Sequence, residues 1–502
     1  MSKINPLWPN FTYFSHQLEG INWMLDKELN GISVPNRDGS MNVLVRGGFQ
    51  CDDMGLGKTI QVTSVIINNA KPATLLIAPL AMIDTWSGVL QRAGCAVYEV
   101  AHTKSGLKPA LKSGEVEKTA SDPWKLMNDP NAPVQRRKVR PAVYISNYEK
   151  LYHNPSLFRR DWDRVVLDEA HKIRNGDGSI ARYARKIVAP IRWAVTGTPL
   201  VNSLKDIVSL LAFIGVPYSP LWRWDTRYNQ ILPDLVIHRS LDSLRKVIKG
   251  APPVPEIHNF VLPFTSKDEE EFYFGVQGAT ESLMKKYSKE LLSSTEAFKL
   301  LLRLRQISVH PQVYINSKRR EDMGYDRDDW IDASSKLEKI NEIISHDDTT
   351  KIHKYIIFCQ FNDEMALIRQ YLLNECLVED ENILLYNGSM NQKERAAVLA
   401  KSKETTQTTV LLLQLQAGGV GLNLQEYDRI IFVSPWWTSA LMDQAIARAV
   451  RMGQTEVVKV YHLRLAAEKE ATINIDEMIN NKAEEKRKML EKLFAMCSHS
   501  TD

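Results

Sequence analysis

The sequence predicts an α/β protein with two parallel sheets, separated in the chain by a mostly helical stretch. Short apolar runs alternate with helical patterns over residues 1–205 and again over residues 331–475, which is the pattern of doubly wound parallel sheets. Over residues 206–330 strand-like runs become rare, and apolar residues recur at helical spacing. A glycine-rich loop early in the chain is the third observation, because such loops join a strand to a helix in α/β domains that bind phosphate. Residues 476–502 are expected to form a C-terminal helix.

The composition is that of a globular protein with several domains. At 502 residues we expect roughly three domains, each with its own core. The formal net charge is +4, and 44% of residues are hydrophobic, so a surface for nucleic acid would need local clustering of charge. The five cysteines are widely spaced and form no C-x-x-C pair, which excludes a zinc ribbon, a RING finger and a disulfide framework.

No segment of the sequence has the pattern of a membrane span or a signal peptide. The longest uncharged stretch, residues 207–222, is interrupted by Pro217 and Pro220 and is shorter than the roughly 20 residues that a span requires. The N-terminus lacks the apolar core of a signal peptide. We therefore expect an intracellular protein without a membrane partner.

The glycine-rich loop has the composition of a phosphate-binding loop. It consists of Asp52, Asp53, Met54, Gly55, Leu56, Gly57, Lys58 and Thr59. The two glycines permit a tight turn whose backbone N–H groups close around phosphate oxygens, Lys58 can reach the β- and γ-phosphates, and the Thr59 hydroxyl can bind Mg²⁺. Asp52 stands where the strict pattern has glycine, so a glycine-rich turn before an ordinary helix stays open as an alternative.

Four further apolar runs in the first half predict buried strands. They lie at residues 74–79, 142–145, 164–167 and 193–195. The third run leads directly into Asp168 and Glu169. Beside a phosphate loop, Asp168 can hold Mg²⁺ while Glu169 orients and deprotonates the attacking water. An Asp-Glu pair at a strand end is common, so the link depends on the loop upstream.

A helix is expected at the N-terminal end of the first half. Residues 14–24 predict it, with Leu18, Ile21 and Leu25 on the apolar face. Gln17 offers both a donor and an acceptor, which suits the edge of an adenine ring, although a surface glutamine is the alternative. The basic, proline-containing residues 101–141 are expected to form a surface loop, with contact to phosphate as the other interpretation.

The middle of the chain is expected to be helical and to contain a connector. The proline-rich residues 251–255 predict a rigid connector, and residues 298–306 predict a helix. Arg303 and Arg305 of that helix are either phosphate contacts or part of a solvated face.

The second half predicts another parallel sheet but contains no phosphate loop. Its expected strands lie at residues 355–358, 383–386, 410–413, 430–433 and 457–463. Gly421 belongs to a second glycine-rich stretch and is a candidate nucleotide contact. Arg448 and Arg451 stand three residues apart, which predicts a shared helix face. They are either exposed, solvated charges or arginine fingers that act on a nucleotide held by the first half.

Taken in order, these motifs resemble those of the SWI/SNF-type ATPases of helicase superfamily two. The phosphate loop is similar to the family's Asp-Glu-Met-Gly-Leu-Gly-Lys-Thr, with Asp53 in place of Glu. Residues 76–86, which end at Trp86, and residues 168–175, 196–202 and 302–311 are also similar to family motifs. The sequence departs from the family in its second half, at residues 414–416, Ser434, Ala447 and Val450.

The resemblance implies two RecA-like lobes, residues 1–205 and 331–475, with helical protrusions formed by residues 206–330. It also implies ATP and Mg²⁺ as cofactors, Gln17 on adenine, and arginine fingers from the second lobe. The expected activity is ATP-driven movement on double-stranded DNA without strand separation, in chromatin, transcription or repair. Protein partners would direct it, in the nucleus or in a viral replication or virion compartment. A nucleotide-gated scaffold subunit and an RNA helicase are the two alternatives.

Overall fold

The computed structural model divides the chain into two compact units. Unit 1 comprises residues 1–248 and 488–502, and unit 2 comprises residues 249–487. The residues described are 4–36, 38, 41–100, 109–110, 141–153, 155–158, 161–245, 247–248, 250–287, 294–375, 377–418, 422–466 and 474–497. Most of the loop expected at residues 101–141 therefore lies outside the described residues.

Unit 1 is built on a mostly parallel sheet in the order β1-β2-β8-β7-β3-β6-β4-β5, with β9 beside β2. The strands are β1 Ile32–Val34, β2 Val43–Gln50, β3 Thr74–Ile77, β4 Ala96–Val100, β5 Pro109–Ala110, β6 Ala142–Ser146, β7 Arg164–Asp168, β8 Ile191–Val195 and β9 Val236–Ile237. Only β1 and β5 pair antiparallel to their neighbours among these described strands. Because β2, β8 and β7 are adjacent and parallel, their carboxyl ends meet at one edge of the sheet.

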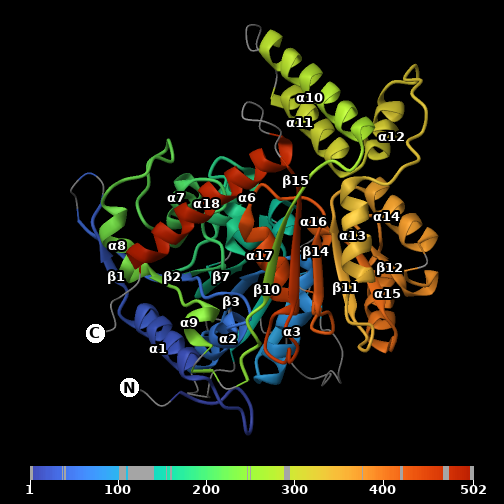
Figure 1. Ribbon diagram of the computed structural model, residues 1–502. Helices are drawn as coiled ribbons and strands as arrows, with labels where there is room; N and C mark the ends of the chain where they lie inside the picture. The colour runs from blue at the N-terminus through green and yellow to red at the C-terminus, as the bar shows by residue number, and fades with distance from the viewer. Residues whose placement is uncertain are drawn as a thin grey trace. The chain divides into compact units, whose positions relative to one another are not determined.

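Helices cover both faces of this sheet (Figure 1). On one face lie α1 Ser15–Leu29, α2 Lys58–Asn68 and α3 Ile83–Arg92. On the other lie α5 Tyr148–His153, α6 Ser179–Lys186, α7 Leu204–Ile214 and α8 Tyr228–Leu235, together with Leu493 and Cys497 from the end of α18 Ile475–Cys497. The short elements of unit 1 are η1 Leu80–Met82, η2 Pro155–Phe158, η3 Ala170–Ile173 and α9 Leu241–Leu244.

Unit 2 contains a fully parallel sheet in the order β10-β15-β14-β11-β13-β12. The strands are β10 Glu256–Leu262, β11 Lys354–Cys359, β12 Ile383–Tyr386, β13 Thr409–Gln414, β14 Arg429–Phe432 and β15 Lys459–Leu465. One face packs on α13 Ser335–Ser345 and α14 Asn362–Asn374, and the other on α15 Gln392–Glu404 and α17 Ser439–Ala449. The short elements are α16 Leu415–Gly418 and η4 Asp380–Asn382.

A separate group of helices extends from unit 2. Figure 1 shows α10 Lys267–Tyr287 and α11 Ser294–Val309 side by side, with α12 Pro311–Glu321 next to them. They share a small core of their own with the first turns of α18. The expected α/β class is therefore confirmed: the chain has two RecA-like, parallel-sheet lobes and a helical protrusion.

Every apolar run that predicts a strand is a strand in the structure, but other strands have no such signal. The missed β2 contains Gly47, where a Cβ would lie only 1.9 Å from the Arg192 carbonyl oxygen of β8. Glycine is required there for the close approach of two strands, and it also interrupts the apolar run. The missed β10 follows the proline-rich connector and is an edge strand whose side chains are mostly exposed, so it lacks an apolar run.

The helix expected over residues 14–24 is α1, in which His16 and Gln17 are buried together with Ile21 and Leu25, whereas Leu18 is 37% exposed. One expectation about helices is wrong. Helix α17 ends at Ala449, so Arg451 does not share its face with Arg448. The chain turns instead through residues 451–454, where Gly453 adopts a left-handed conformation at φ +101°. No helix within the described residues is long and apolar enough to cross a membrane.

Candidate active site

The loop between β2 and α2 has the local geometry of an anion site. Gly55 and Gly57 adopt left-handed φ values of +88° and +80°, which glycine reaches without strain. Gly57 caps α2 and no side chain accepts a bond from the first turn, so backbone N–H groups there face the loop. A Cβ at Gly57 would lie 2.5 Å from Gln17 Nε2, so packing also requires glycine.

Lys58 lies over the loop that precedes it. Its Nζ donates to the backbone oxygens of Asp52, at 2.7 Å, and Asp53, at 3.2 Å. A Cβ at Gly197 would lie 3.6 Å from Lys58 Nζ, so the residues that follow β8 border the loop. Thr59 is half-buried in the first turn of α2. These positions bring the ammonium, the hydroxyl and the helix N-terminus to one place.

Asp168 ends β7 at the same edge of the sheet. The indole Nε1 of Trp86 donates to Asp168 Oδ2 at 2.8 Å, and the Tyr148 hydroxyl donates to the Asp168 backbone oxygen at 2.6 Å. Burial raises the pKa of Asp168, and the neighbouring Glu169 charge raises it further. The charge of Lys58 acts in the opposite direction, so Lys58 and Asp168 lie within electrostatic reach.

Glu169 adopts a conformation that is unusual for a residue with a side chain. Its φ of +52° and ψ of 50° are left-handed, and strain of this kind concentrates at functional sites. Its carboxylate lies 3.4 Å from His171 Nδ1. Burial lowers the pKa of His171 although Glu169 opposes the shift, so His171 is neutral at physiological pH.

Gln17 is buried against the phosphate loop, which excludes the surface alternative. Its Oε1 accepts from the Phe14 N–H at 3.1 Å, and its Nε2 lies 3.4 Å from the Leu56 carbonyl oxygen. The side chain therefore joins the start of α1 to the loop. Contact with adenine remains a prediction.

The side chain of Asp52 has no exposed surface. Gln50 Nε2 and Gln61 Nε2 donate to its Oδ2 at 2.8 and 2.9 Å, and Arg239 Nε donates to its Oδ1 at 2.9 Å. Burial acts to raise the pKa of Asp52, but these bonds and the Arg239 charge outweigh burial and keep it below its ordinary value. Sequence reasoning missed Arg239, which lies far from the motif in the chain. It placed Trp86 in a segment similar to a family motif but did not predict its contact with Asp168.

The predicted residues of the second half belong to unit 2. Arg448 is only 7% exposed and Arg451 is half-buried, so the interpretation as exposed, solvated charges is wrong. Burial lowers the pKa of Arg451. Gly421 lies outside the described residues.

The two arginines of α11 are also held within unit 2. Arg303 donates to Gln306 Oε1 at 2.7 Å and to Glu321 Oε2 at 2.6 Å. Arg305 is buried over the ring of Trp436, 4.8 Å from its centroid, and burial lowers its pKa to about 10. The interpretation that Arg305 belongs to a solvated helix face is therefore wrong.

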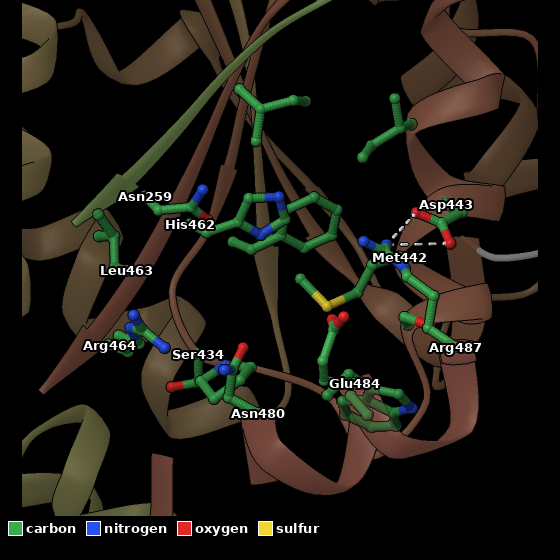
Figure 2. A pocket seen from close by; sticks show the side chains of 17 residues that line it. Asn259, Ser434, Met442, Asp443, His462, Leu463, Arg464, Asn480, Glu484 and Arg487 are labelled. Carbon is green, nitrogen blue, oxygen red and sulfur yellow. Dashed lines mark hydrogen bonds and ion pairs between the residues drawn. The ribbon is translucent and has the colours of Figure 1, made fainter. Parts of the chain in front are cut away.

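Unit 2 also contains a cavity of about 520 Å³ between β10, β14 and β15 on one side and α17 and α18 on the other. Figure 2 shows Arg487 paired with Asp443 at its rim, at 3.0 Å, and His462 within it. His462 stacks on Phe432, and burial lowers its pKa to about 4, so the imidazole is neutral. None of the predicted site residues lines this cavity.

Two family descriptions match the chain. The SNF2-related domain matches residues 16–313, and the helicase conserved C-terminal domain matches residues 335–453. These matches cover most of both units.

The chain is similar to curated proteins of several kinds. It is 25% identical to a "probable global transactivator" of Orgyia pseudotsugata multicapsid polyhedrosis virus, over 95% of this chain and 91% of the relative. It is 25% identical to the "DNA repair protein RAD5" of Gibberella zeae, over 82% of this chain and 51% of the relative. A "chromodomain-helicase-DNA-binding protein 1-like" of Danio rerio is also 25% identical, over 89% of this chain and 41% of the relative. The chain thus spans 51% and 41% of the lengths of the last two relatives.

Among solved structures, the chain is similar to a "Sulfolobus solfataricus SWI2/SNF2 ATPase core in complex with dsDNA". The two share 21% identity, at a TM-score of 0.39, over 98% of this chain and 95% of the other.

Proposed function

The chain belongs to the SNF2-related family of helicase superfamily two, and from this premise we propose that it is an ATP-driven translocase on double-stranded DNA. Members of this family hydrolyse ATP, and the chain is an enzyme of that class. The finer assignment, movement along duplex DNA, is our proposal.

The observation that carries the proposal is the meeting of Lys58, Asp168 and Glu169 at one edge of the unit 1 sheet. These groups fit a nucleoside triphosphate with Mg²⁺. The ammonium and the helix N–H groups at the loop suit the phosphates, and the buried carboxylate suits the metal. Thr59 and Asp168 would hold the metal, which when bound neutralises charge on the β- and γ-phosphates. Lys58 would leave the loop carbonyls and bind the phosphates.

Glu169 would orient the attacking water and accept its proton. Its left-handed backbone constrains the direction of the carboxylate, which lies 3.4 Å from His171 Nδ1. Geometry of this kind supports the role of general base. Gln17 would contact adenine, and the backbone of residues 52–59 would enclose the phosphates.

We assign Arg448 and Arg451 the role of arginine fingers, and Gly421 a nucleotide contact from the second lobe. A guanidinium that stabilises the departing γ-phosphate typically accelerates turnover by about 10³- to 10⁵-fold. Arg448 is buried and Arg451 is half-buried, which argues against the alternative of exposed, solvated charges.

The names of the relatives support DNA as the substrate. One is a DNA repair protein and another a DNA-binding helicase-like protein, whereas a third is a viral transactivator. They favour a nuclear or viral setting in chromatin, transcription or repair, with protein partners that direct the motor.

The test is ATP hydrolysis by the purified chain with duplex DNA, single-stranded DNA and RNA. We expect duplex DNA to stimulate turnover most, and Glu169→Gln to retain ATP binding while turnover is nearly abolished. Stimulation by RNA alone would favour the RNA helicase. Hydrolysis that no nucleic acid stimulates would favour the nucleotide-gated scaffold. Normal turnover in Glu169→Gln would refute the assignment of the base.

A further inference from the structure

We propose that Arg239 is a positioning residue for ATP hydrolysis: it holds the phosphate loop in its binding shape through the carboxylate of Asp52. This inference rests on the proposed function. Arg239 Nε donates to Asp52 Oδ1 at 2.9 Å, and Arg239 Nη2 donates to Asp52 Oδ2. The pair is bidentate, which is the strongest geometry that a guanidinium forms with a carboxylate.

Asp52 transmits this constraint to the lysine that would bind phosphate. Its carboxylate faces Arg239, whereas its backbone oxygen accepts the bond from Lys58 Nζ at 2.7 Å. A single residue thus joins Arg239 to Lys58. The pair anchors the side chain of Asp52 and so restrains the backbone that carries this carbonyl.

Arg239 also fixes the two helices that flank the loop. It donates to the backbone oxygen of His16 in α1 and, at 3.0 Å, to Gln61 Oε1 in α2. Gln61 in turn donates to Asp52 Oδ2. One guanidinium therefore joins the loop to its helix and to the helix that carries Gln17.

The backbone around Arg239 runs along the start of the loop. We call residues 237–241 the exit segment, because they begin at the last residue of β9, near the end of the N-terminal part of unit 1. Cys51 N–H donates to the Ile237 oxygen at 2.8 Å, Asp53 N–H donates to the Arg239 oxygen at 3.0 Å, and Leu241 N–H donates to Asp53 Oδ2 at 2.8 Å. The exit segment and the phosphate loop are thus fixed to each other on both sides of Asp52.

Removal of the guanidinium would leave a fully buried carboxylate without its charge partner. Such a carboxylate is strongly unfavourable, so the loop would rearrange to hydrate or protonate Asp52. Lysine cannot replace the pair, because a point charge does not match two oxygens in a plane. ATP would then have to order the loop as it binds, which weakens binding while the bound state still reacts.

The experiment compares two arginine-to-lysine variants of the same unit. Arg164 forms a fully buried pair with Glu28, with Nε 2.6 Å from Oε1, and begins β7 at the end remote from Asp168. Arg164→Lys is therefore the control for the loss of a buried ion pair. We expect Arg239→Lys to raise the KM for ATP about tenfold with kcat nearly unchanged. The reason is that the entropy cost of ordering the backbone of a single residue corresponds to about a tenfold loss of affinity. Arg164→Lys should lower the melting temperature and leave KM unchanged.

A second readout needs no activity. In the absence of ATP, hydrogen exchange of the amides of residues 51–56 should be faster in Arg239→Lys than in wild type, and ATP should restore protection. The inference is overturned if Arg239→Lys matches Arg164→Lys in KM and shows wild-type exchange in the loop.

Asp52→Asn provides an independent test of the pair. It keeps the shape but removes the charge, and it should raise KM in the same direction. Because the two residues act as a unit, the double variant should be little worse than either single one. Fully additive effects would also overturn the inference. Failure of wild type to hydrolyse ATP would instead refute the proposed function.

Discussion

Trp86 is expected to control the metal affinity of the site although it touches no substrate. Its indole N–H is the side-chain donor to Asp168 Oδ2, at 2.8 Å, and the ring is completely buried. Trp86→Phe keeps an aromatic ring in the same core and removes this N–H. The Asp168 carboxylate would lose both its orientation and part of what opposes its raised pKa.

The size of the effect follows from the type of bond that is lost. A hydrogen bond to a charged group contributes about 1.5–3 kcal/mol when buried. Loss of a side chain that orients a metal ligand typically reduces metal affinity or activity by about 10- to 100-fold. We therefore expect the Mg²⁺ concentration for half-maximal ATP hydrolysis to rise by about 10- to 100-fold.

Trp193→Phe is a matched control. Trp193 is also fully buried, and its indole N–H also donates to a buried carboxylate, Glu28 Oε1 at 2.9 Å. The two variants lose the same atoms and the same kind of bond, but only Trp86 contacts Asp168. The assay is ATP hydrolysis over a range of free Mg²⁺, beside thermal melts of both variants. Equal Mg²⁺ dependence in the two variants, at similar losses of stability, would refute the reasoning.

Three more outcomes are expected. Arg448→Ala and Arg451→Ala should reduce kcat by about 10³-fold or more while ATP affinity, measured by direct binding, changes far less; full turnover in the folded double variant would contradict their role as fingers. Gly57→Ala should weaken ATP binding at least tenfold, because a left-handed alanine is strained by about 1–2 kcal/mol and its Cβ meets Gln17; equilibrium binding at unchanged affinity would oppose this. Burial raises the pKa of Glu364 to about 7, despite two backbone N–H bonds, so the folded state holds this proton more tightly than the unfolded state and stability should fall as pH rises towards 7. The melting temperature of Glu364→Gln minus that of wild type should therefore increase between about pH 5 and pH 8. A difference in melting temperature that does not change with pH would exclude the effect.

The sequence was sufficient for those parts of the fold and site that depend on local pattern. Parallel strands buried on both faces are continuous apolar runs, so β3, β7 and β13 were evident. The edge strand β10 has no such run, and β2 carries glycines that a close neighbour requires. The burial of Arg305 could not be predicted from local pattern either, because it depends on the ring of Trp436, which is distant in the sequence.

The phosphate loop and the Asp168–Glu169 pair could be predicted from the sequence, but the residues that hold them in place could not. The reason is that these residues are far away in the sequence. Trp86 contacts a carboxylate 82 residues away, and Arg239 contacts one 187 residues away, and nothing in the local sequence indicates which residues form each pair. The departure at Asp52 was nevertheless informative. A glycine at that position would place no carboxylate in the core, whereas a buried aspartate requires hydrogen-bond donors, a positive charge or a proton. In this chain Gln50 and Gln61 supply donors, and Arg239 of the exit segment supplies the positive charge that keeps the pKa of Asp52 low.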